Sequence, residues 1–324
     1  MKILLIGKDN FLNWTNNIKR AFNRIDSVEI DTLYTNRLGL FSDIERNIKK
    51  VFKSQDKNSV LKNAIENKIE SYRPDVIFVI SPFFFHKEVF SSFEKFDSIV
   101  KLAWVGDQFL PERRSIAKYF NKIYCTDTSF IKSANEYSFP EAKYLPLAYD
   151  DEVFYDRGLN RKNSLLFIGS HTPQRSHLLN EINDNINIPV KLIGQKWKKH
   201  ISSDFEYLSK NISIKEVDNE YNTNNFVLNL NNELNAINGL NMRTFEAVAA
   251  GSCLIQDNVK DVVLNFTPDK DILVYNSIVE IGEIIDRVTK DRGLYKKIIN
   301  NGKKMVQSRH TYNHRAEEIL RDLS

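Results

Sequence analysis

KILLIG, residues Lys2–Gly7, and SLLFIGS, residues Ser164–Ser170, decide the fold of this chain of 324 residues. Each is a nearly continuous apolar run, which is typical of a parallel β-strand buried on both faces. Each run also opens a series in which strand and helix patterns alternate. Because a chain of this length exceeds the size at which a single hydrophobic core stops growing, we expect two domains of roughly 150 residues each.

The first series has the alternation of a doubly wound parallel sheet. Its expected strands are Lys2–Gly7, Val28–Tyr34, Asp75–Ile80, Ile99–Gly106 and Lys122–Asp127. Its expected helices are Asn13–Arg24, Ser42–Tyr72 with the apolar residues Ile44, Ile48, Val51 and Phe52, Lys87–Phe96, and a short one before the last strand.

The second series repeats this alternation after Tyr144–Asn163, a stretch without a clear period that we expect to connect the domains. Its expected strands are Ser164–Ser170, Val190–Gly194, Ser213–Val217, Phe226–Asn231, Ser252–Asp257 and Asp271–Tyr275, with helices over Met242–Ala250 and Ile278–Thr289. We therefore predict an α/β protein with two Rossmann-like domains, residues 1–150 and 151–305, facing a cleft at which the carboxyl ends of the strands converge.

Composition excludes several classes of protein. The net charge of +4, from 46 basic and 42 acidic residues, is too small and too evenly spread to indicate a nucleic-acid-binding protein. Cys125 and Cys253 are far apart in apolar stretches, so we expect buried free thiols and no cysteine metal site. The opening MKILLIGKDN is too short an apolar run for a signal peptide, and no run approaches the roughly 20 residues that span a bilayer. We therefore expect a cytoplasmic protein.

The most informative stretch is NAINGLNMRTFEAVAAGSCLIQD, Asn235–Asp257. Asn241 is a suitable N-cap and Gly251 a stop, so a helix is expected from Met242. Arg243 and Glu246 flank its apolar stripe near the first turn. A helix N-terminus that points into a cleft suits a diphosphate, and a carboxylate beside it can accept hydrogen bonds from ribose hydroxyls. The alternative is that Arg243 and Glu246 form a solvated pair on an ordinary packing helix.

The segment NMRTFEAVAAGSCLIQD resembles the donor-binding helix of the CgeB-type (spore-maturation) glycosyltransferases, which are similar to the family 4 GT-B enzymes. LLFIGSHTPQR, KLIGQKW and HTYNHRAEEIL match the same family in the same order, and the matches cover most of Leu145–Leu320. The N-terminal half resembles the family only through AWVGDQ, Ala103–Gln108. The resemblance implies a GT-B fold in which residues 306–324 form a helix that packs back toward the N-terminal domain.

The resemblance also implies roles for single residues. Glu246 matches the second carboxylate of the family 4 Glu-x7-Glu pattern and would contact the ribose, whereas the first carboxylate falls at Asn238, which brings no charge. Gly169 and Arg175 occupy the expected loop after the first strand of the second domain, near the donor phosphates. The predicted donor-binding residues are Gly169, Arg175, Asn238, Asn241, Arg243 and Glu246. The alternative for Arg175 is a solvent-facing residue at a helix start.

Two candidates for contacts with acceptor or sugar come from the first domain. Asp107 follows a strand end beside Gly106, and His86 follows the third strand in SPFFFHKE. Either residue can instead be a capping or surface residue. The aromatic run Phe83–Phe85 is expected to pack in the core, with an acceptor or membrane contact as its alternative. Five other histidines show no metal-ligand spacing, so we predict no metal and no cofactor beyond the donor substrate.

The predicted function is transfer of a sugar from a nucleoside-diphosphate sugar, UDP-sugar first, to a glycan, lipid-linked or protein acceptor. Metal independence rests on the helix dipole and the arginines, and retention of configuration is implied by the resemblance alone. Peripheral association with the inner face of the membrane is left open, nucleic-acid partners are not expected, and no oligomeric state is predicted.

Two other functions stay open at this stage. A nucleotide-sugar epimerase could have the same two-lobed shape, and a degenerate nucleotide- or partner-binding module would agree with Asn238. A nicotinamide enzyme is disfavoured because IGKDNFLN after the first strand lacks the G-x-G-x-x-G loop.

Overall fold

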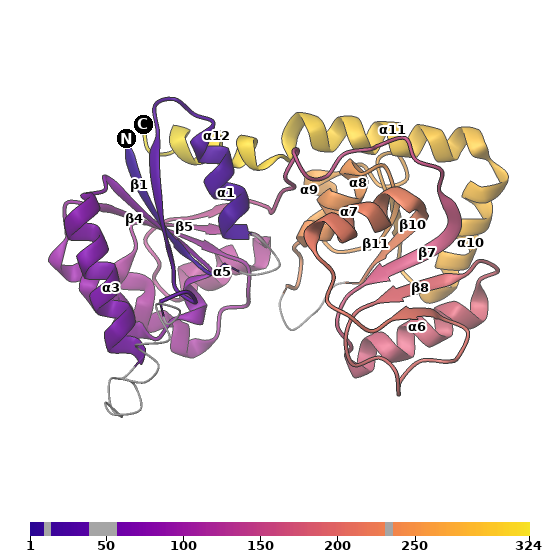
Figure 1. Ribbon diagram of the computed structural model, residues 1–324, viewed down its shortest axis with the longest axis horizontal. Coiled ribbons are helices and arrows are strands. Elements are labelled where there is room, and N and C mark those ends of the chain that lie inside the picture. Colours follow the sequence, from indigo (N-terminus) through magenta and orange to yellow (C-terminus); the bar gives the residue numbers. More distant parts are fainter. Residues whose placement is uncertain (10–13, 39–56, 231–235) are drawn as a thin grey trace, which may run out of the picture. The chain divides into compact units, whose positions relative to one another are not determined.

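The computed structural model describes residues 1–9, 14–38, 57–230 and 236–324 (Figure 1). The chain forms two compact units. Unit 1 contains Met1–Pro146, a short stretch that ends at Ile237, and Arg315–Ser324. Unit 2 contains the rest of the chain between Leu147 and His314. The last ten residues thus belong to the same unit as the first strand.

Unit 1 is built on a parallel sheet of six strands in the order β2-β1-β3-β4-β5-β6. The strands are β1 (Lys2–Gly7), β2 (Glu29–Tyr34), β3 (Val76–Ile80), β4 (Val100–Val105), β5 (Lys122–Cys125) and β6 (Ala142–Tyr144). Every residue of β3 is buried, as the apolar run predicts for a strand covered on both faces. The predicted doubly wound sheet is confirmed here.

Helices cover both faces of this sheet. They are α1 (Trp14–Asn23), α3 (Lys57–Tyr72), α4 (Lys87–Phe90), α5 (Thr128–Glu136) and the end of α12 (Tyr312–Arg321), with 3-10 turns at Pro82–Phe84, Ser91–Lys95 and Pro111–Tyr119. Side chains of α3, α4 and α5 share one core, while α1 packs Trp14 edge-on against Trp104 on the other face, with ring centroids 5.1 Å apart. The predicted helix over Ser42–Tyr72 is seen as α3, and its residues 42–56, with Ile44, Ile48, Val51 and Phe52, lie outside the described residues.

The aromatic run of unit 1 is divided between core and surface. Phe83 and Phe85 are buried, and Phe83 contacts Phe109 edge-on at 4.8 Å between ring centroids. Phe84 is exposed, and the Lys8 ammonium lies 3.9 Å from its ring centroid. The expected core packing is therefore right for two of the three rings.

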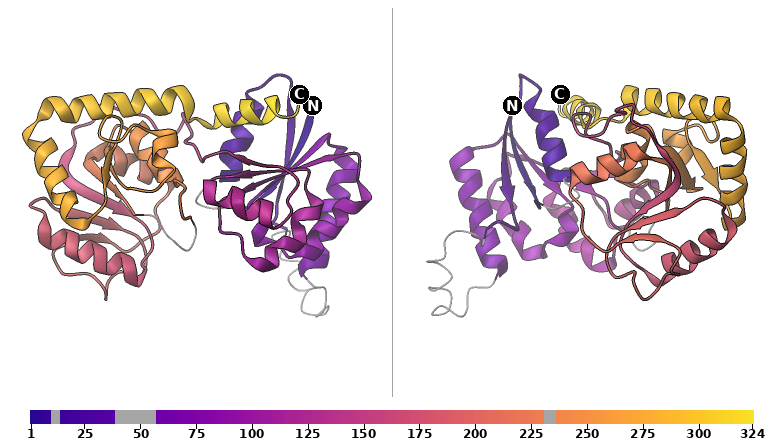
Figure 2. Two further views of the ribbon diagram at one scale, coloured as in Figure 1. Left: turned by 180° about the vertical axis from the view of Figure 1, so that it is seen from behind. Right: turned by 45° about the vertical axis from the view of Figure 1, so that its right-hand side comes forward.

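Unit 2 is built on a second parallel sheet of six strands, in the order β12-β11-β10-β7-β8-β9. The strands are β7 (Lys162–Ile168), β8 (Val190–Ile193), β9 (Glu206–Leu208), β10 (Asn224–Asn229), β11 (Cys253–Asp257) and β12 (Leu273–Tyr275). The helices are α6 (Pro173–Asn185), α7 (Ile214–Thr223), α8 (Met242–Ala249), α9 (Val262–Asn265), α10 (Ile278–Lys290) and α11 (Arg292–Arg309). Helix α6 packs against α10, and α8 packs against α7 and α11, so that helices lie on both sides of the strands (Figure 2).

The prediction of a strand over Ser213–Val217 is wrong, because this segment begins helix α7. The Ser213 hydroxyl accepts a hydrogen bond from the Glu216 backbone N–H, and the Glu216 carboxylate accepts one from the Ser213 N–H at 2.7 Å. This reciprocal capping box satisfies two donors that a helix start otherwise leaves unpaired, and it favours a helix over the predicted strand. The sixth strand of the sheet is instead β9, at the sheet edge.

The capping box gives a first test. Ser213→Ala should lower the free energy of unfolding by about 1 kcal/mol, because it removes the hydroxyl that caps α7. Urea unfolding measures the change. Ser203→Ala is the matched control, since exposed Ser203 hydrogen-bonds only its neighbour Asp204 among the described residues and its loss should have no measurable effect. Equal stability of the two variants would contradict a stabilising cap.

Candidate functional site

Helix α8 begins with an N-cap whose side chain does not cap it. Asn241 has the extended backbone of an N-cap, with φ −88° and ψ 170°, but its side chain makes no capping hydrogen bond. Instead the Asn241 Nδ2 donates to Asn229 Oδ1, 3.0 Å away at the end of β10. The predicted helix start is therefore confirmed, and the asparagine side chain is turned toward the sheet.

A buried amide network holds this helix start against the sheet. Asn229 Nδ2 donates to Thr244 Oγ1 at 3.0 Å and to Gln256 Oε1 at 2.9 Å, and the Thr244 hydroxyl donates to Gln256 Oε1 at 2.9 Å. All three side chains are at most 1% exposed. Because a buried polar group is costly unless it is hydrogen-bonded, a satisfied network of this kind fixes one arrangement of β10, β11 and the first turn of α8.

Arg243 and Glu246 lie on α8 without forming an ion pair. Glu246 is only 5% exposed, and among the described residues neither its carboxylate nor the Arg243 guanidinium has a hydrogen-bond or ion-pair partner. Burial raises the pKa of Glu246 to about 8; the Arg243 charge opposes this rise and Asp150 adds to it. The alternative of a solvated Arg243–Glu246 pair is wrong, because the carboxylate is buried and the two charged groups do not meet.

Arg175 is placed differently from the prediction. It lies in the first turn of α6, where the Thr172 hydroxyl caps its backbone N–H, and not in the loop before the helix. Its guanidinium donates to the carbonyl oxygens of Ser170 and Leu230, at 3.1 and 3.2 Å, and the residue is 8% exposed. Burial and the nearby charge of Arg243 lower its pKa to about 10, so that it remains positively charged at neutral pH. The alternative of a solvent-facing residue is also wrong.

Two glycines bring the turns after β7 and β8 into backbone contact. Gly194 has φ +154°, and a Cβ atom on it would lie 1.9 Å from the carbonyl oxygen of Gly169. The same oxygen accepts a hydrogen bond from Trp197 Nε1 at 2.8 Å. A Cβ on Gly169 would lie 3.5 Å from Arg175 Nη1, so Gly169 and Arg175 are neighbours.

Arg243 connects Arg175 with Glu246, because its charge helps to lower the pKa of Arg175 and opposes the rise in the pKa of Glu246. Asn241 joins them through the N-cap. Asn238 lies in the loop before α8, where its carbonyl oxygen accepts a hydrogen bond from the Asp261 N–H at 3.1 Å. This loop follows β10, as Gly169 follows β7, so these residues belong to the carboxyl ends of parallel strands in one sheet.

Asp107 and His86 belong to unit 1 and are described with that unit alone. Asp107 follows β4, and His86 follows the neighbouring strand β3 as the N-cap residue of α4. The His86 side chain is exposed and its Nδ1 lies 3.4 Å from the Glu88 carboxylate. Their proposed contacts with acceptor or sugar stay predictions.

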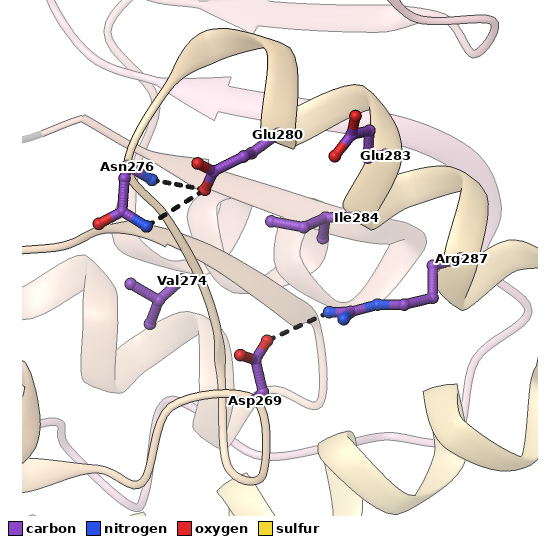
Figure 3. A pocket seen from close by; sticks show the side chains of 7 residues that line it. All are labelled: Asp269, Val274, Asn276, Glu280, Glu283, Ile284 and Arg287. Atoms are coloured by element: carbon purple, nitrogen blue, oxygen red, sulfur yellow. Dashed lines mark hydrogen bonds and ion pairs between the residues drawn. The ribbon is translucent and has the colours of Figure 1, made fainter.

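A surface pocket in unit 2 is separate from these residues. It has a volume of about 290 Å³ and is lined by Asp269, Val274, Asn276, Glu280, Glu283, Ile284 and Arg287 (Figure 3). Arg287 donates to Asp269 at 3.1 Å, and Glu280 accepts hydrogen bonds from Asn276. None of the predicted donor-binding residues lines this pocket. Within the described ranges, no group of three or more His, Cys, Asp or Glu residues is placed to hold a metal ion.

Several residues of this region were not predicted from the sequence. Asn229 and Gln256 were visible as polar residues inside the apolar strands FVLNLN and SCLIQD, and a polar side chain in a buried strand needs a partner. Tyr221, in the neighbouring helix α7, gave no such signal because tyrosines are common in cores. No described helix is both long enough and apolar enough to cross a bilayer.

The two parallel sheets with flanking helices define a GT-B fold, and solved structures show the same architecture. Sucrose-phosphate synthase from Thermosynechococcus elongatus superposes with a TM-score of 0.70 at 12% identity, over 100% of this chain and 99% of that chain. A glycosyltransferase from Rickettsia africae gives 0.69 at 13% identity, over 99% and 97%. HepE of Anabaena, solved in complex with UDP, gives 0.68 at 10% identity, over 100% and 99%. At such identities these likenesses show the fold.

The sequence adds a more particular match. Residues 174–321 match the model of the family described as "Glycosyl transferase-like". This range includes Arg175 and the whole of α8. No curated protein sequence gives a significant match. The family match and the GT-B fold together support a glycosyltransferase enzyme.

Proposed function

We propose that this chain is a glycosyltransferase whose unit 2 binds a nucleoside-diphosphate sugar, UDP-sugar first, through Arg243, Glu246 and the N-terminus of α8. One observation carries the proposal: the charges of Arg175 and Arg243 interact, with only a smaller opposing effect of Asp257 on Arg175, and within the described chain neither arginine forms an ion pair. Like charges repel, so two such arginines beside a helix N-terminus favour an anionic ligand.

Each group has a separate role in this proposal. Arg243 and the first backbone N–H groups of α8 bind the diphosphate and stabilise it as the leaving group. Glu246 accepts hydrogen bonds from the ribose hydroxyls. Arg175 adds positive charge, while two of its N–H donors are used to hold the loops after β7 and β10. Anabaena HepE has been solved with UDP and with UDP-glucose, which supports a uridine nucleotide for this chain as well.

The remaining parts of the proposal rest on the resemblance to the CgeB-type enzymes. They are transfer with retention, without a metal ion, to a glycan, lipid-linked or protein acceptor in glycan biosynthesis. Asn238 contributes an amide in place of the family's first carboxylate. Asp107 and His86 are the candidates for acceptor contacts. We further propose that the enzyme works in the cytoplasm, at the inner face of the membrane when its acceptor is lipid-linked.

A ligand screen followed by turnover tests the proposal. In a thermal-shift screen of nucleotides and nucleotide sugars, UDP at about 100 times its dissociation constant should stabilise the protein by about 2.7 kcal/mol. Release of UDP from the stabilising sugar nucleotide should then continue in EDTA, because the helix N-terminus and arginines replace a divalent ion.

The possible results separate the functions that the sequence left open. Loss of turnover in EDTA, restored by Mn²⁺ or Mg²⁺, would contradict metal independence. Conversion of the donor to an epimer without release of UDP would favour an epimerase. Binding without any turnover across a panel of acceptors and water would favour a nucleotide-binding module.

A further inference from the structure

Tyr221 is a fully buried residue that reaches toward Glu246 from another helix. It lies near the end of α7, which packs against α8, and its ring is 0% exposed. Its backbone carbonyl oxygen accepts hydrogen bonds from Arg161 and Ser252, and its ring centroid lies 6.0 Å from that of Phe154. These contacts fix the position of the ring.

The hydroxyl of this tyrosine has no hydrogen-bond partner in the described protein. A buried hydroxyl without a partner costs free energy, because it gave up its bonds to water on folding. A phenylalanine would fill the same space without this cost. The hydroxyl is therefore unfavourable in the empty site unless another state of the protein uses it.

The Glu246 carboxylate is the acceptor that suits the Tyr221 hydroxyl best. Arg161 donates to the carbonyl oxygens of both Tyr221 and Ala250, and the Ala250 N–H donates to the Glu246 carbonyl oxygen at 3.0 Å, so Tyr221 lies beside the turn of α8 that follows Glu246. Burial, and after it the charge of Glu246, raises the pKa of the Tyr221 phenol, and among the described residues no hydrogen bond joins the two side chains. Three charged or titratable groups interact electrostatically with Glu246: Tyr221 from α7, Arg243 from α8 itself, and Asp150 from the segment before β7. Only Tyr221 and Arg243 can donate to an ionised carboxylate, and a carboxylate accepts about four hydrogen bonds.

We propose that Tyr221 is a positioning residue of the donor site: when the nucleotide is bound, its hydroxyl donates a hydrogen bond to the Glu246 carboxylate, directly or through one water. This bond holds the carboxylate in the orientation in which its other lone pairs accept from the ribose hydroxyls. The inference rests on the proposed function, because it needs Glu246 to contact the ribose. Tyr221 does not touch the reacting atoms.

The test is a comparison of UDP affinity and melting temperature in Tyr221→Phe. UDP affinity should fall about tenfold, because a hydrogen bond to a charged acceptor is lost from the bound state. The melting temperature should stay the same or rise, because the empty protein loses an unpartnered hydroxyl. Tyr295→Phe is the matched control in unit 2: its hydroxyl donates to Asn225 Oδ1 at 3.0 Å, so this variant should melt earlier and bind UDP as the wild type does.

Two further readouts separate positioning from a purely structural role. The affinity of the wild type should rise with pH as Glu246 ionises, and Tyr221→Phe should move that rise to higher pH because the ionised form loses a donor. In the double variant with Glu246→Gln, the second substitution should cost nothing more, since Tyr221 acts through Glu246.

Two results would overturn the inference alone. Tyr221→Phe could bind UDP as tightly as the wild type, or its effect could add fully to that of Glu246→Gln; in both cases the proposed function survives if Glu246→Gln by itself weakens UDP binding. If Glu246→Gln has no effect on UDP binding, the donor site itself is wrongly assigned.

Discussion

Glu246→Gln should be more stable than the wild type at about pH 9, by on the order of 4 kcal/mol, and nearly as stable as the wild type at about pH 4.5. Burial raises the pKa of Glu246 from 4.5 to about 8, so the folded protein holds a proton that the unfolded chain releases between these two values. The contribution of Glu246 to wild-type stability therefore falls through this window, by about 1.4 kcal/mol per pH unit, and does not fall further above it. Glutamine carries no such proton, so the variant lacks the decline.

At pH 9, where Glu246 is ionised, the same substitution should weaken UDP binding by roughly 10- to 150-fold, because a charged acceptor for the ribose hydroxyls becomes a neutral amide. Urea unfolding at several pH values gives the change in the free energy of unfolding, and calorimetric titration gives the change in UDP affinity. Glu283→Gln, on the exposed side of α10, is the matched control and should change neither. A variant that is stabilised at high pH but binds UDP normally would show a buried carboxyl with no part in the donor site.

Arg243→Gln should bind UDP roughly 10- to 150-fold more weakly while its affinity for uridine stays near that of the wild type. The reason is that Arg243 is proposed to contact the diphosphate, which uridine lacks. Its stability should change little, since within the described residues the guanidinium has no hydrogen bond or ion pair to lose. In contrast, Glu246→Gln should lower the affinity for both UDP and uridine, because both ligands contain the ribose.

Arg175→Gln is the informative comparison for this prediction. It leaves the buried carbonyl oxygens of Ser170 and Leu230 without their donor, and each unsatisfied group costs about 1–3 kcal/mol, so the free energy of unfolding should fall clearly. Calorimetric titration with UDP and with uridine, beside urea unfolding, separates the two arginines. Equal losses of UDP and uridine affinity in Arg243→Gln would place this arginine away from the diphosphate.

Much of the fold could be predicted because the strands are apolar runs that parallel sheets bury on both faces. The strands β1, β3, β7 and β11 could be predicted from their apolar runs without tertiary information. The edge strands β6 and β9 were missed, because each has three residues and shows no period. The segment at Ser213 was assigned to a strand, although Ser213 and Glu216 already carried the capping signature of a helix start.

Only the parts of the candidate site that depend on local sequence patterns could be predicted. Asn241, Arg243 and Glu246 follow from one helix start, since an N-cap, a stop glycine and the helical period are all local. The bonds of Arg175 depend on Leu230, which is 55 residues away in the chain. The burial of Glu246 depends on how α7 packs against α8. Such facts follow from tertiary packing, and the sequence pattern of either segment alone does not contain them.

The contact between the turns after β7 and β8 limits which amino-acid substitutions this sequence can accept during evolution. Every single-base missense change in a glycine codon introduces a residue with a Cβ atom. At position 194 that atom would lie 1.9 Å from the Gly169 carbonyl oxygen, on a backbone with φ +154° that side chains rarely adopt. Every missense change open to this codon would thus push the two turns apart, and one of these turns leads into Arg175. Among descendants of this gene, we therefore expect no amino-acid substitution at position 194 to be selectively neutral.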